Sequence, residues 1–304
     1  MALCILLPSC NQNTGNTNLI KEEKPSITTK ISHSKEISGE NALIHAERIV
    51  AIGDRSPASP GAKQQRQYLT KILQSYGWQV REQAFTTPTP KGDISFVNVR
   101  ARFGNTNNWS TPLGIVSCHI DTKTGIPGFV GANDGASGAA LLLELARILQ
   151  IRPDIANKVE FVFFDGEESF EPHMTTEDGL YGSKYYAGQL KNPLPPWLIN
   201  LDMVGRQGMK IRIPPDTADS LYTHYIQGIH ALNLSPSVWG VASGAIMDDH
   251  IPFMQKGIPS LNIIDQFTDG IWWHTSADSI DILGADSFYQ SGRMVLYLLE
   301  QLSH

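Results

Sequence analysis

The sequence predicts an α/β protein, a single domain in which a central twisted sheet, mixed but mostly parallel, is flanked by helices on both faces. Strand-like and helix-like segments alternate from Leu113 onward, which is the pattern of βαβ units. The run 159–164 is apolar and rich in strand-forming residues, as expected of a parallel strand that is buried on both faces. Neither a repeat nor a linker interrupts residues 41–304, which favours one domain.

Periodicity gives the individual elements. Ala42, Ala46 and Ile49 fall on one face of a helix, which the proline-rich turn 56–61 ends. A second helix runs to Gly77, and residues 78–85 and 97–103 are expected to form a hairpin-like pair of strands. Further strands are predicted at 113–118, 159–165, 197–201 and 258–264, and further helices at 136–150, 180–190, 217–234, 249–256 and 285–302.

Composition excludes several classes of protein. The 304 residues are 41% hydrophobic and 18% charged, as is usual for a globular protein with a sizeable core. A formal net charge of −6 with scattered basic residues gives no electrostatic footprint for nucleic acid or an anionic membrane. No stretch approaches the ~20 apolar residues that a transmembrane helix needs. Cys118 is the only cysteine in the predicted globular part, so no disulfide is expected within that part.

The N-terminal residues suggest an anchored protein. Residues 1–10 form a short apolar run that ends in a small residue and Cys10, like a truncated lipoprotein signal with a lipid anchor on that cysteine. Residues 11–40 are polar and predict a disordered tether, so the folded domain would comprise residues 41–304. The predicted location is the bacterial periplasm or cell envelope. A floppy N-terminus on a cytoplasmic protein is the alternative.

Two neighbouring carboxylates, Glu167 and Glu168, follow the apolar run 159–164. In open α/β sheets, ligands bind in the crevice outside the carboxyl ends of the strands. Adjacent acids on a loop can point in different directions, so one can bind a metal while the other moves a proton. Two solvated glutamates that cap the next helix are the simpler alternative.

Other polar side chains fall at predicted strand ends or in the loops beside them. Asp121 shares a strand face with His119 and could orient its imidazole, although a surface pair would show the same spacing. The other candidates are Asp134 at the small-residue start of a helix, Asp202 at a strand end, Asp248-Asp249-His250 at the opening of a helix and His274 in a turn-like region. Capping or turn formation would explain each of them singly. Histidines and carboxylates that converge on one crevice are, together, the ligands expected of zinc.

The order of these residues resembles the zinc-dependent M28 exopeptidase clan, and longer strings resemble the animal-type glutaminyl-peptide cyclotransferases. The resemblance runs from about Ala42 to the C-terminus. The strings are Ser59-Pro60-Gly61, Phe163-Phe164-Asp165-Gly166-Glu167-Glu168-x-Phe170, Asp178-x-Leu180-Tyr181-Gly182-Ser183, Asp248-Asp249-His250-Ile251-Pro252-Phe253 and Trp273-His274-Thr275.

This resemblance implies an acyltransferase that cyclises the N-terminal glutamine of peptides or proteins to pyroglutamate and releases ammonia. It also implies one zinc per chain, and a monomer is expected. Zinc would polarise the side-chain amide of the glutamine while a glutamate moves the proton. The implied residues are Asp134, Glu168 and His274 for the metal, Glu167, Asp248 and Asp202 for catalysis, and Trp273, Phe267 and Phe170 for the substrate.

Departures from the animal enzymes keep a two-zinc aminopeptidase open as the alternative. The string 133–138 is closer to the aminopeptidase version, and residues 172–174 lack the expected tryptophan. Ala139 stands about where a disulfide cysteine is expected, and Asn262 stands in place of a histidine. A non-catalytic binding module is the third hypothesis, which a complete ligand set disfavours. In the aminopeptidase a second metal would hold the substrate's amine, and the candidates for that metal or its surroundings are His119, Asp121 and Asp202.

Overall fold

The computed structural model describes residues 36–104, 109–268 and 270–303. The predicted signal at 1–10, and the predicted tether up to residue 35, lie outside these residues. Near the predicted end of the tether, Ile37 is buried and helix α1 (Gly39–Val50) begins two residues earlier than expected. The Ser38 hydroxyl caps this helix by accepting a hydrogen bond from the Asn41 backbone N–H (3.1 Å). Within the described residues, no helix is both long and apolar enough to span a membrane.

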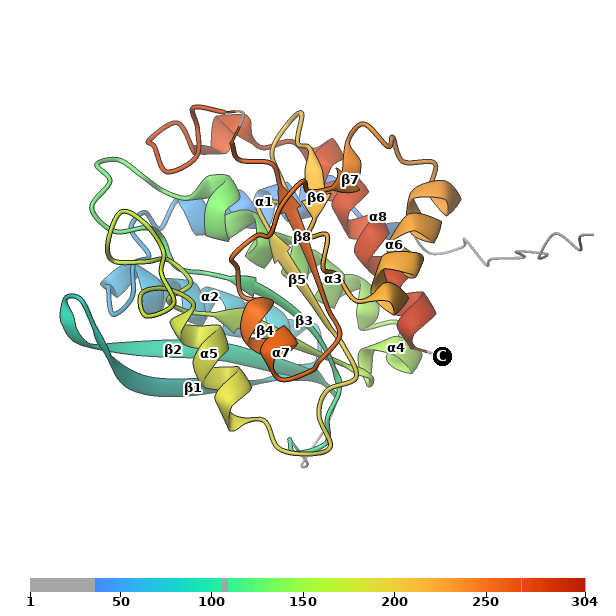
Figure 1. Ribbon diagram of the computed structural model, residues 1–304, viewed down its shortest axis with the longest axis horizontal. Helices are drawn as coiled ribbons and strands as arrows, with labels where there is room; N and C mark the ends of the chain where they lie inside the picture. Colours follow the sequence, from blue (N-terminus) through green and yellow to red (C-terminus); the bar gives the residue numbers. More distant parts are fainter. Residues whose placement is uncertain (1–35, 105–108, 269, 304) are drawn as a thin grey trace, which may run out of the picture. The chain divides into compact units, whose positions relative to one another are not determined.

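The described residues form a single α/β domain with an eight-stranded mixed sheet, which confirms the predicted fold class (Figure 1). The strand order is β1-β2-β4-β3-β5-β8-β6-β7. β4, β3, β5 and β8 are parallel neighbours, whereas β2 and β6 pair antiparallel at the two sides of this parallel block. The strands are β1 (Trp78–Thr89), β2 (Gly92–Phe103), β3 (Gly114–His119), β4 (Val159–Phe164), β5 (Leu198–Asp202), β6 (Ile211–Ile213), β7 (Trp239–Val241) and β8 (Ser260–Asp265).

Helices cover both faces of the sheet (Figure 1). The large core on one face includes buried residues of α1, α2, α3, α6 and α8, whereas α5 and α7 pack on the other face around Phe164, Tyr186 and Phe253. α3 is buried along nearly its whole surface, which explains why its sequence is apolar all round. The other helical segments are α2 (Pro60–Ser75), η2 (Ala132–Ser137), α3 (Gly138–Leu149), α4 (Pro153–Ala156), α5 (Tyr181–Gln189), α6 (Asp219–Ala231), α7 (Ile251–Gln255), η3 (Ile280–Ile282) and α8 (Ala285–Leu302).

The structure corrects several predicted boundaries. The β1–β2 ladder continues to the pair Thr89 and Gly92, so most of the predicted turn region at 88–92 belongs to the strands. β6 and β7 have three residues each, too few for a period to be recognised in the sequence. The predicted helix 249–256 is shorter, because α7 begins at Ile251 and its N-cap, His250, makes no side-chain cap hydrogen bond.

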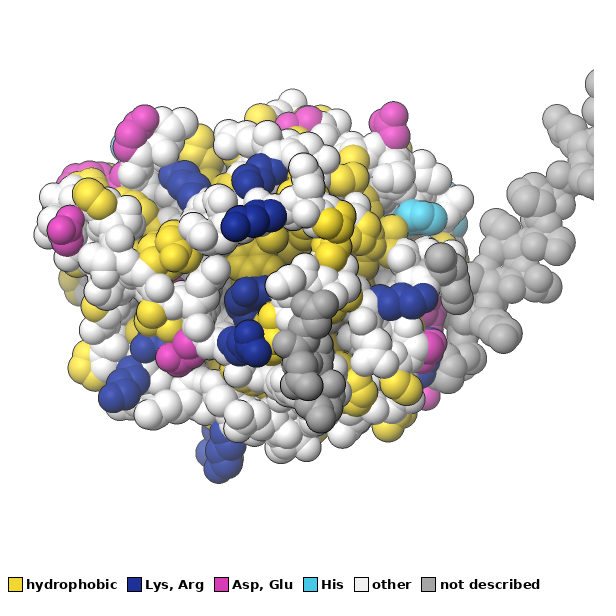
Figure 2. All heavy atoms as spheres, turned by 90° about the horizontal axis from the view of Figure 1, so that it is seen from below, with side chains coloured by type: hydrophobic (Ala, Val, Ile, Leu, Met, Phe, Trp, Pro, Cys, Tyr) yellow, Lys and Arg dark blue, Asp and Glu magenta, His cyan; other side chains and the backbone are white. Residues whose placement is uncertain are grey.

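A buried carboxylate joins three elements at the amino end of β4. Glu160 accepts hydrogen bonds from Nε of Arg100 (2.5 Å), Nε of Arg102 (2.7 Å) and the hydroxyl of Tyr186 (3.0 Å). These side chains line a hollow of about 410 Å³ beside Trp109. Figure 2, seen from this side, shows Lys and Arg side chains around an apolar depression. The hollow therefore lies at the opposite end of the parallel strands from their carboxyl ends.

We expect Glu160→Gln to lower the free energy of unfolding by roughly 3 kcal/mol, because the guanidinium groups of Arg100 and Arg102 would both lose a carboxylate partner in a buried site. Urea denaturation followed by tryptophan fluorescence measures this change. Glu82→Gln is the matched control, since Glu82 is 54% exposed and pairs with Arg66 at 3.4 Å. It should cost less than about 1 kcal/mol, and equal losses in both variants would contradict the expectation.

Candidate active site

The carboxyl ends of β3, β4 and β5 form the predicted crevice. The strand order reverses around β3, because the chain passes from β3 to β4 on one side and reaches β5 on the other. Such a switch point is where open α/β sheets bind ligands. A pocket of about 380 Å³ opens there. Its lining includes Asp134, Glu167, Glu168, Asp202, Trp273 and His274.

One cluster in this pocket contains the three residues predicted to hold zinc. Asp134, Glu168 and His274 each offer a ligand atom, and these atoms lie within 4.8 Å of one another. Nε2 of His274 is 3.2 Å from Oε1 of Glu168 and 3.4 Å from Oδ2 of Asp134. Burial acts to lower the pKa of His274, but the two carboxylates raise it to about 10, so the cluster attracts a cation strongly. Two carboxylates and one imidazole fit the donor set of a catalytic zinc site.

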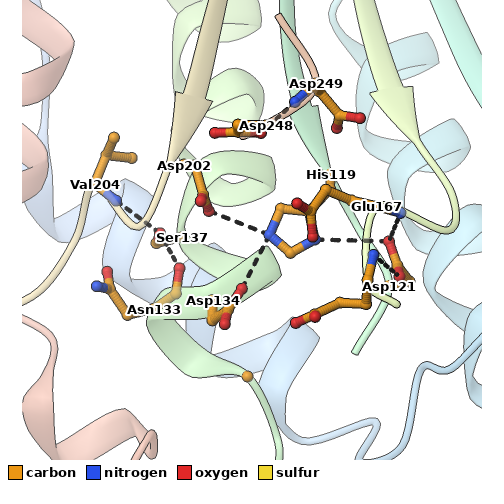
Figure 3. A network of polar contacts seen from close by, with 12 residues as sticks. His119, Asp121, Asn133, Asp134, Ser137, Glu167, Asp202, Val204, Asp248 and Asp249 are labelled. Atoms are coloured by element: carbon orange, nitrogen blue, oxygen red, sulfur yellow. Dashed lines mark hydrogen bonds and ion pairs between the residues drawn. The ribbon is translucent and has the colours of Figure 1, made fainter. Parts of the chain in front are cut away.

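A second cluster shares Asp134 with the first. Nε2 of His119 lies 3.1 Å from Oδ1 of Asp134 and 3.2 Å from Oδ1 of Asp202, as Figure 3 shows. Burial and the nearby Asp248 raise the pKa of Asp202 to about 7, against the effect of His119. Burial alone would raise the pKa of Asp134, yet the imidazoles of His119 and His274 hold it below its usual range. Asp134 is thus the carboxylate between two histidines, and a second metal is geometrically feasible.

The backbone around Asp134 explains how this side chain reaches the crevice. Gly135 has φ +97°, and a Cβ atom there would lie 2.7 Å from the carbonyl oxygen of Asp121, so the turn requires glycine. The Asp278 carboxylate accepts hydrogen bonds from the backbone N–H groups of Asn133 (2.7 Å) and Asp134 (3.0 Å). α3 begins only at Gly138. The simple N-cap explanation of Asp134 is therefore wrong.

Asp121 holds the two glutamates in the same way. Its carboxylate accepts hydrogen bonds from the backbone N–H groups of Glu167 (3.0 Å) and Glu168 (3.1 Å), and one oxygen lies 3.6 Å from Nδ1 of His119 (Figure 3). Asp121 is in neither candidate metal cluster and lies behind both. Glu167 and Glu168 are buried, and the next helix begins only at Tyr181, which rules out two solvated capping glutamates.

Glu167 has the electrostatic environment of a proton-transfer group. Burial raises its pKa well above the usual range, and the neighbouring Glu168 carboxylate raises it further. A carboxyl group with a raised pKa can hold a proton near neutral pH and give it up again.

Asp248 is placed differently from the prediction. It is 1% exposed and does not line the pocket. Its carboxylate accepts hydrogen bonds from the amide groups of Asn200 (3.0 Å) and Asn262 (2.7 Å) and from the backbone N–H of Asp249 (2.5 Å). Both oxygen atoms of Asp248 thus have donors outside the pocket lining, and its nearby carboxylate contributes to the raised pKa of Asp202. Asp249, which the sequence analysis treated only as part of a helix start, is also buried, and burial raises its pKa.

Two of the three predicted substrate residues line the pocket. The rings of Trp273 and His274 stack with centroids 3.9 Å apart, and Phe267 packs on Trp273 at 4.6 Å. His274 has φ +52°, a left-handed conformation that turns this loop sharply at the predicted ligand. Phe170 does not line the pocket, because its ring packs between Phe96 (6.3 Å) and Tyr181 (5.9 Å).

Lys123 is a pocket residue that the sequence analysis missed. Its ammonium group donates hydrogen bonds to the Ser169 hydroxyl (2.5 Å) and to the backbone oxygens of Ser169 (2.7 Å) and Glu171 (3.0 Å). It also lies 3.7 Å from Oε2 of Glu168. Only its position two residues beyond Asp121 could have indicated from the sequence that Lys123 lies near the site. Asn200, Asn262 and Asp278 were likewise invisible as supports, because hydrogen bonds between distant segments define them.

An α/β sheet with Asp, Glu and His ligands at the carboxyl ends of its parallel strands is the arrangement of a metal-dependent enzyme. Residues 98–299 match Peptidase family M28. The chain is 32% identical to a glutaminyl-peptide cyclotransferase-like protein of Bos taurus, over 81% of this chain and 72% of the relative. It is 30% identical to the glutaminyl-peptide cyclotransferase of Bos taurus, over 82% and 79% respectively.

The solved glutaminyl cyclase of Porphyromonas gingivalis has the same fold, with a TM-score of 0.78 and 28% identity over 88% of this chain and 99% of that one. The chain therefore belongs to the M28 peptidase family and, within it, to the enzymes of the glutaminyl-peptide cyclotransferase group.

We expect Asp121→Asn to weaken metal binding about 10- to 100-fold, because residues behind metal ligands fix their orientation. The amide keeps one oxygen acceptor but cannot accept both backbone N–H groups of the glutamate pair as the carboxylate does. Competition with a chelator measures the affinity. Asp178→Asn is the control. The Asp178 carboxylate accepts hydrogen bonds from two consecutive backbone N–H groups further along the same loop, those of Phe170 and Glu171. An equal loss in both variants would show a general effect on the loop rather than a role for Asp121.

Proposed function

We propose that this enzyme is a zinc-dependent glutaminyl-peptide cyclotransferase, which converts the N-terminal glutamine of peptides or proteins to pyroglutamate and releases ammonia. The observation that carries the proposal is the cluster of Asp134, Glu168 and His274, which opens onto the same pocket as Glu167 and the ring of Trp273. The names and identities of the relatives support the same activity.

In the proposed reaction, the α-amine of the substrate attacks the carbonyl carbon of its own side-chain amide. Glu167 accepts a proton from the amine and delivers it to the amide nitrogen, whose bond to carbon breaks as ammonia leaves. Zinc, when bound, would act as a Lewis acid on the amide carbonyl. Trp273 and Phe267 narrow the pocket, keep the short glutamine chain folded on itself and exclude water.

Asp202 and Asp248 have different roles in this proposal. Asp202 lines the pocket and can donate or accept a hydrogen bond at the reacting nitrogen, since its pKa of about 7 allows both protonation states. Asp248 stays behind it, held by Asn200 and Asn262, and helps to raise that pKa. We therefore propose direct substrate contact for Trp273, Phe267 and Asp202, which line the pocket, and a supporting position for Asp248 and Phe170, which do not.

The shared position of Asp134 is the structural observation that favours a second candidate, a two-zinc aminopeptidase. His119, Asp134 and Asp202 could hold another metal, and in that enzyme a water would attack the peptide bond. A monomer, a lipid anchor at Cys10 and a periplasmic location also remain proposals from the sequence.

The decisive experiment compares products. We expect an N-terminal Gln peptide to lose ammonia with its peptide bonds intact, and an N-terminal Leu peptide to stay unchanged. Mass spectrometry of both mixtures detects the two reactions. Free leucine together with an uncyclised Gln peptide would overturn the proposal in favour of the aminopeptidase.

Metal content separates the same two candidates by an independent route. With one zinc, we expect His274→Ala to lose the metal and His119→Ala to keep it, because only His274 belongs to the cluster with Glu168. Elemental analysis of the wild type and both variants gives the stoichiometry. Two zincs in the wild type, with one lost in each variant, would support the second candidate.

Glu167→Gln should fold and keep its metal but lose about 10²- to 10⁴-fold in turnover, because an amide cannot carry the proton. Glu171→Gln is the control, since Glu171 lies four residues further on the same loop and is 52% exposed, paired with Lys91. It should stay within about twofold of the wild type, as surface changes usually do. If Glu167→Gln kept more than about a tenth of the wild-type rate, Glu167 would not be the proton shuttle.

A further inference from the structure

A third hollow, of about 460 Å³, adjoins the active-site pocket. Its lining comes from Arg212 of β6, the end of β7 with the following loop up to Ile246, and the segment from Ile264 to Thr268. The two hollows share Ala245, Ile246, Ile264 and Phe267 as lining residues. We call this third hollow the exit groove, because a peptide held by its first residue in the pocket has to leave across one of the rims of the pocket.

Exposed apolar side chains concentrate along this route. Seven large hydrophobic side chains are exposed in the described part of the chain, and four of them lie on the pocket, the exit groove or the adjacent loop. Val241 is in the groove lining, Met247 and Trp273 are in the pocket lining, and Ile271 precedes Trp273 on the same loop. Ile271 is 91% exposed. Exposed apolar patches of this kind usually mark a binding surface.

The charged residues of the exit groove are occupied by other contacts. The guanidinium of Arg212 donates to the backbone oxygens of Ile211, Val238 and Ser237. Asp265 accepts hydrogen bonds from Arg206 and from the backbone N–H of Lys210. Besides these two charged residues, the groove lining consists of apolar side chains, three uncharged polar side chains (Ser243, Gln266 and Thr268) and backbone. A charged ligand side chain that loses its water there gains no free ion-pair partner, which penalises its burial.

We propose that the exit groove binds the third and fourth residues of the substrate peptide and selects apolar side chains at those positions. The occupant is the remainder of the same substrate, because the groove is continuous with the pocket through four shared lining residues. This inference rests on the proposed function, and it adds a substrate preference that the pocket alone does not provide. Extended peptides bind such surfaces through backbone contacts for affinity and side-chain contacts for specificity.

The test uses three substrates that share their first residues: Gln-Ala-amide, Gln-Ala-Leu-Leu-Ala and Gln-Ala-Glu-Glu-Ala. We expect the wild-type kcat/KM of the Leu peptide to exceed that of the Glu peptide roughly tenfold, mainly through KM, the scale on which apolar subsites discriminate. Ammonia release gives the rates. The affinities of the same three peptides for the Glu167→Gln variant, measured by calorimetry, provide a readout that needs no turnover.

Two groove variants and one matched control locate the effect. Val241→Ser should reduce the preference for the Leu peptide, and Ser243→Lys should raise kcat/KM for the Glu peptide several-fold by supplying an opposite charge at an exposed groove position. Both should leave Gln-Ala-amide within about twofold of the wild type, because that substrate ends before the groove. Ile151→Ser is the control, since Ile151 is 66% exposed and lies beyond the C-terminal end of α3.

Equal rates and equal affinities for the two pentapeptides would overturn the inference, as would groove variants that behave like Ile151→Ser. If none of the three peptides is cyclised, the proposed function fails, and the affinities still decide whether the groove prefers leucine to glutamate.

Discussion

The burial of many carboxylates in one crevice is the constraint on which the rest of the structure depends. Eight of them are almost inaccessible to solvent: Asp121, Asp134, Glu167, Glu168, Asp202, Asp248, Asp249 and Asp278. Unpaired buried charges of this kind would cost far more than the net stability of a domain. The chain must therefore supply hydrogen-bond donors, cations or protons for each of them, and the loops around the crevice are built from these contacts.

Three kinds of contact meet this requirement for most of the eight carboxylates. Asp121 and Asp278 each accept two consecutive backbone N–H groups, which stabilises the carboxylate and at the same time fixes the loop that presents the glutamate pair or Asp134. The imidazole of His119 lies beside Asp134 and that of His274 beside Glu168. The ammonium of Lys123 also supplies positive charge beside Glu168. Burial raises the pKa of Glu167 and Asp202, so these two groups can take up a proton instead of remaining charged. The same burial that threatens stability thus gives the pocket its acid and base.

The sequence predicted the strands whose ends carry these groups, because long apolar runs and short polar motifs are local signals. The choice of Asp134, Glu168 and His274 as one ligand set came from the family resemblance, and the structure brings these three side chains within ligand distance. It could not show that Asp248 is held by Asn200 and Asn262, since those contacts join residues 48 and 14 positions apart. β6 and β7 were missed because a three-residue strand is too short to show a recognisable pattern. Both strands depend on pairing, since β6 pairs with β8 and β7 pairs with β6.

Asp134 shows why the choice between one metal and two depends on more than the ligand set. Nε2 of His119 lies between oxygens of Asp134 and Asp202, and either a proton on that nitrogen or a divalent cation beside it would satisfy the two carboxylates. The three side chains are therefore compatible with both candidates, the one-zinc cyclotransferase and the two-zinc aminopeptidase. The difference between the two activities must come from the space beside the ligands. An aminopeptidase needs room for an attacking water and for varied side chains, whereas cyclisation needs a narrow pocket with a wall that excludes water. Trp273, stacked on His274 at 3.9 Å and packed against Phe267, provides such a wall beside one member of the first cluster. This aromatic wall, rather than the number of carboxylates and histidines, is what favours the cyclase.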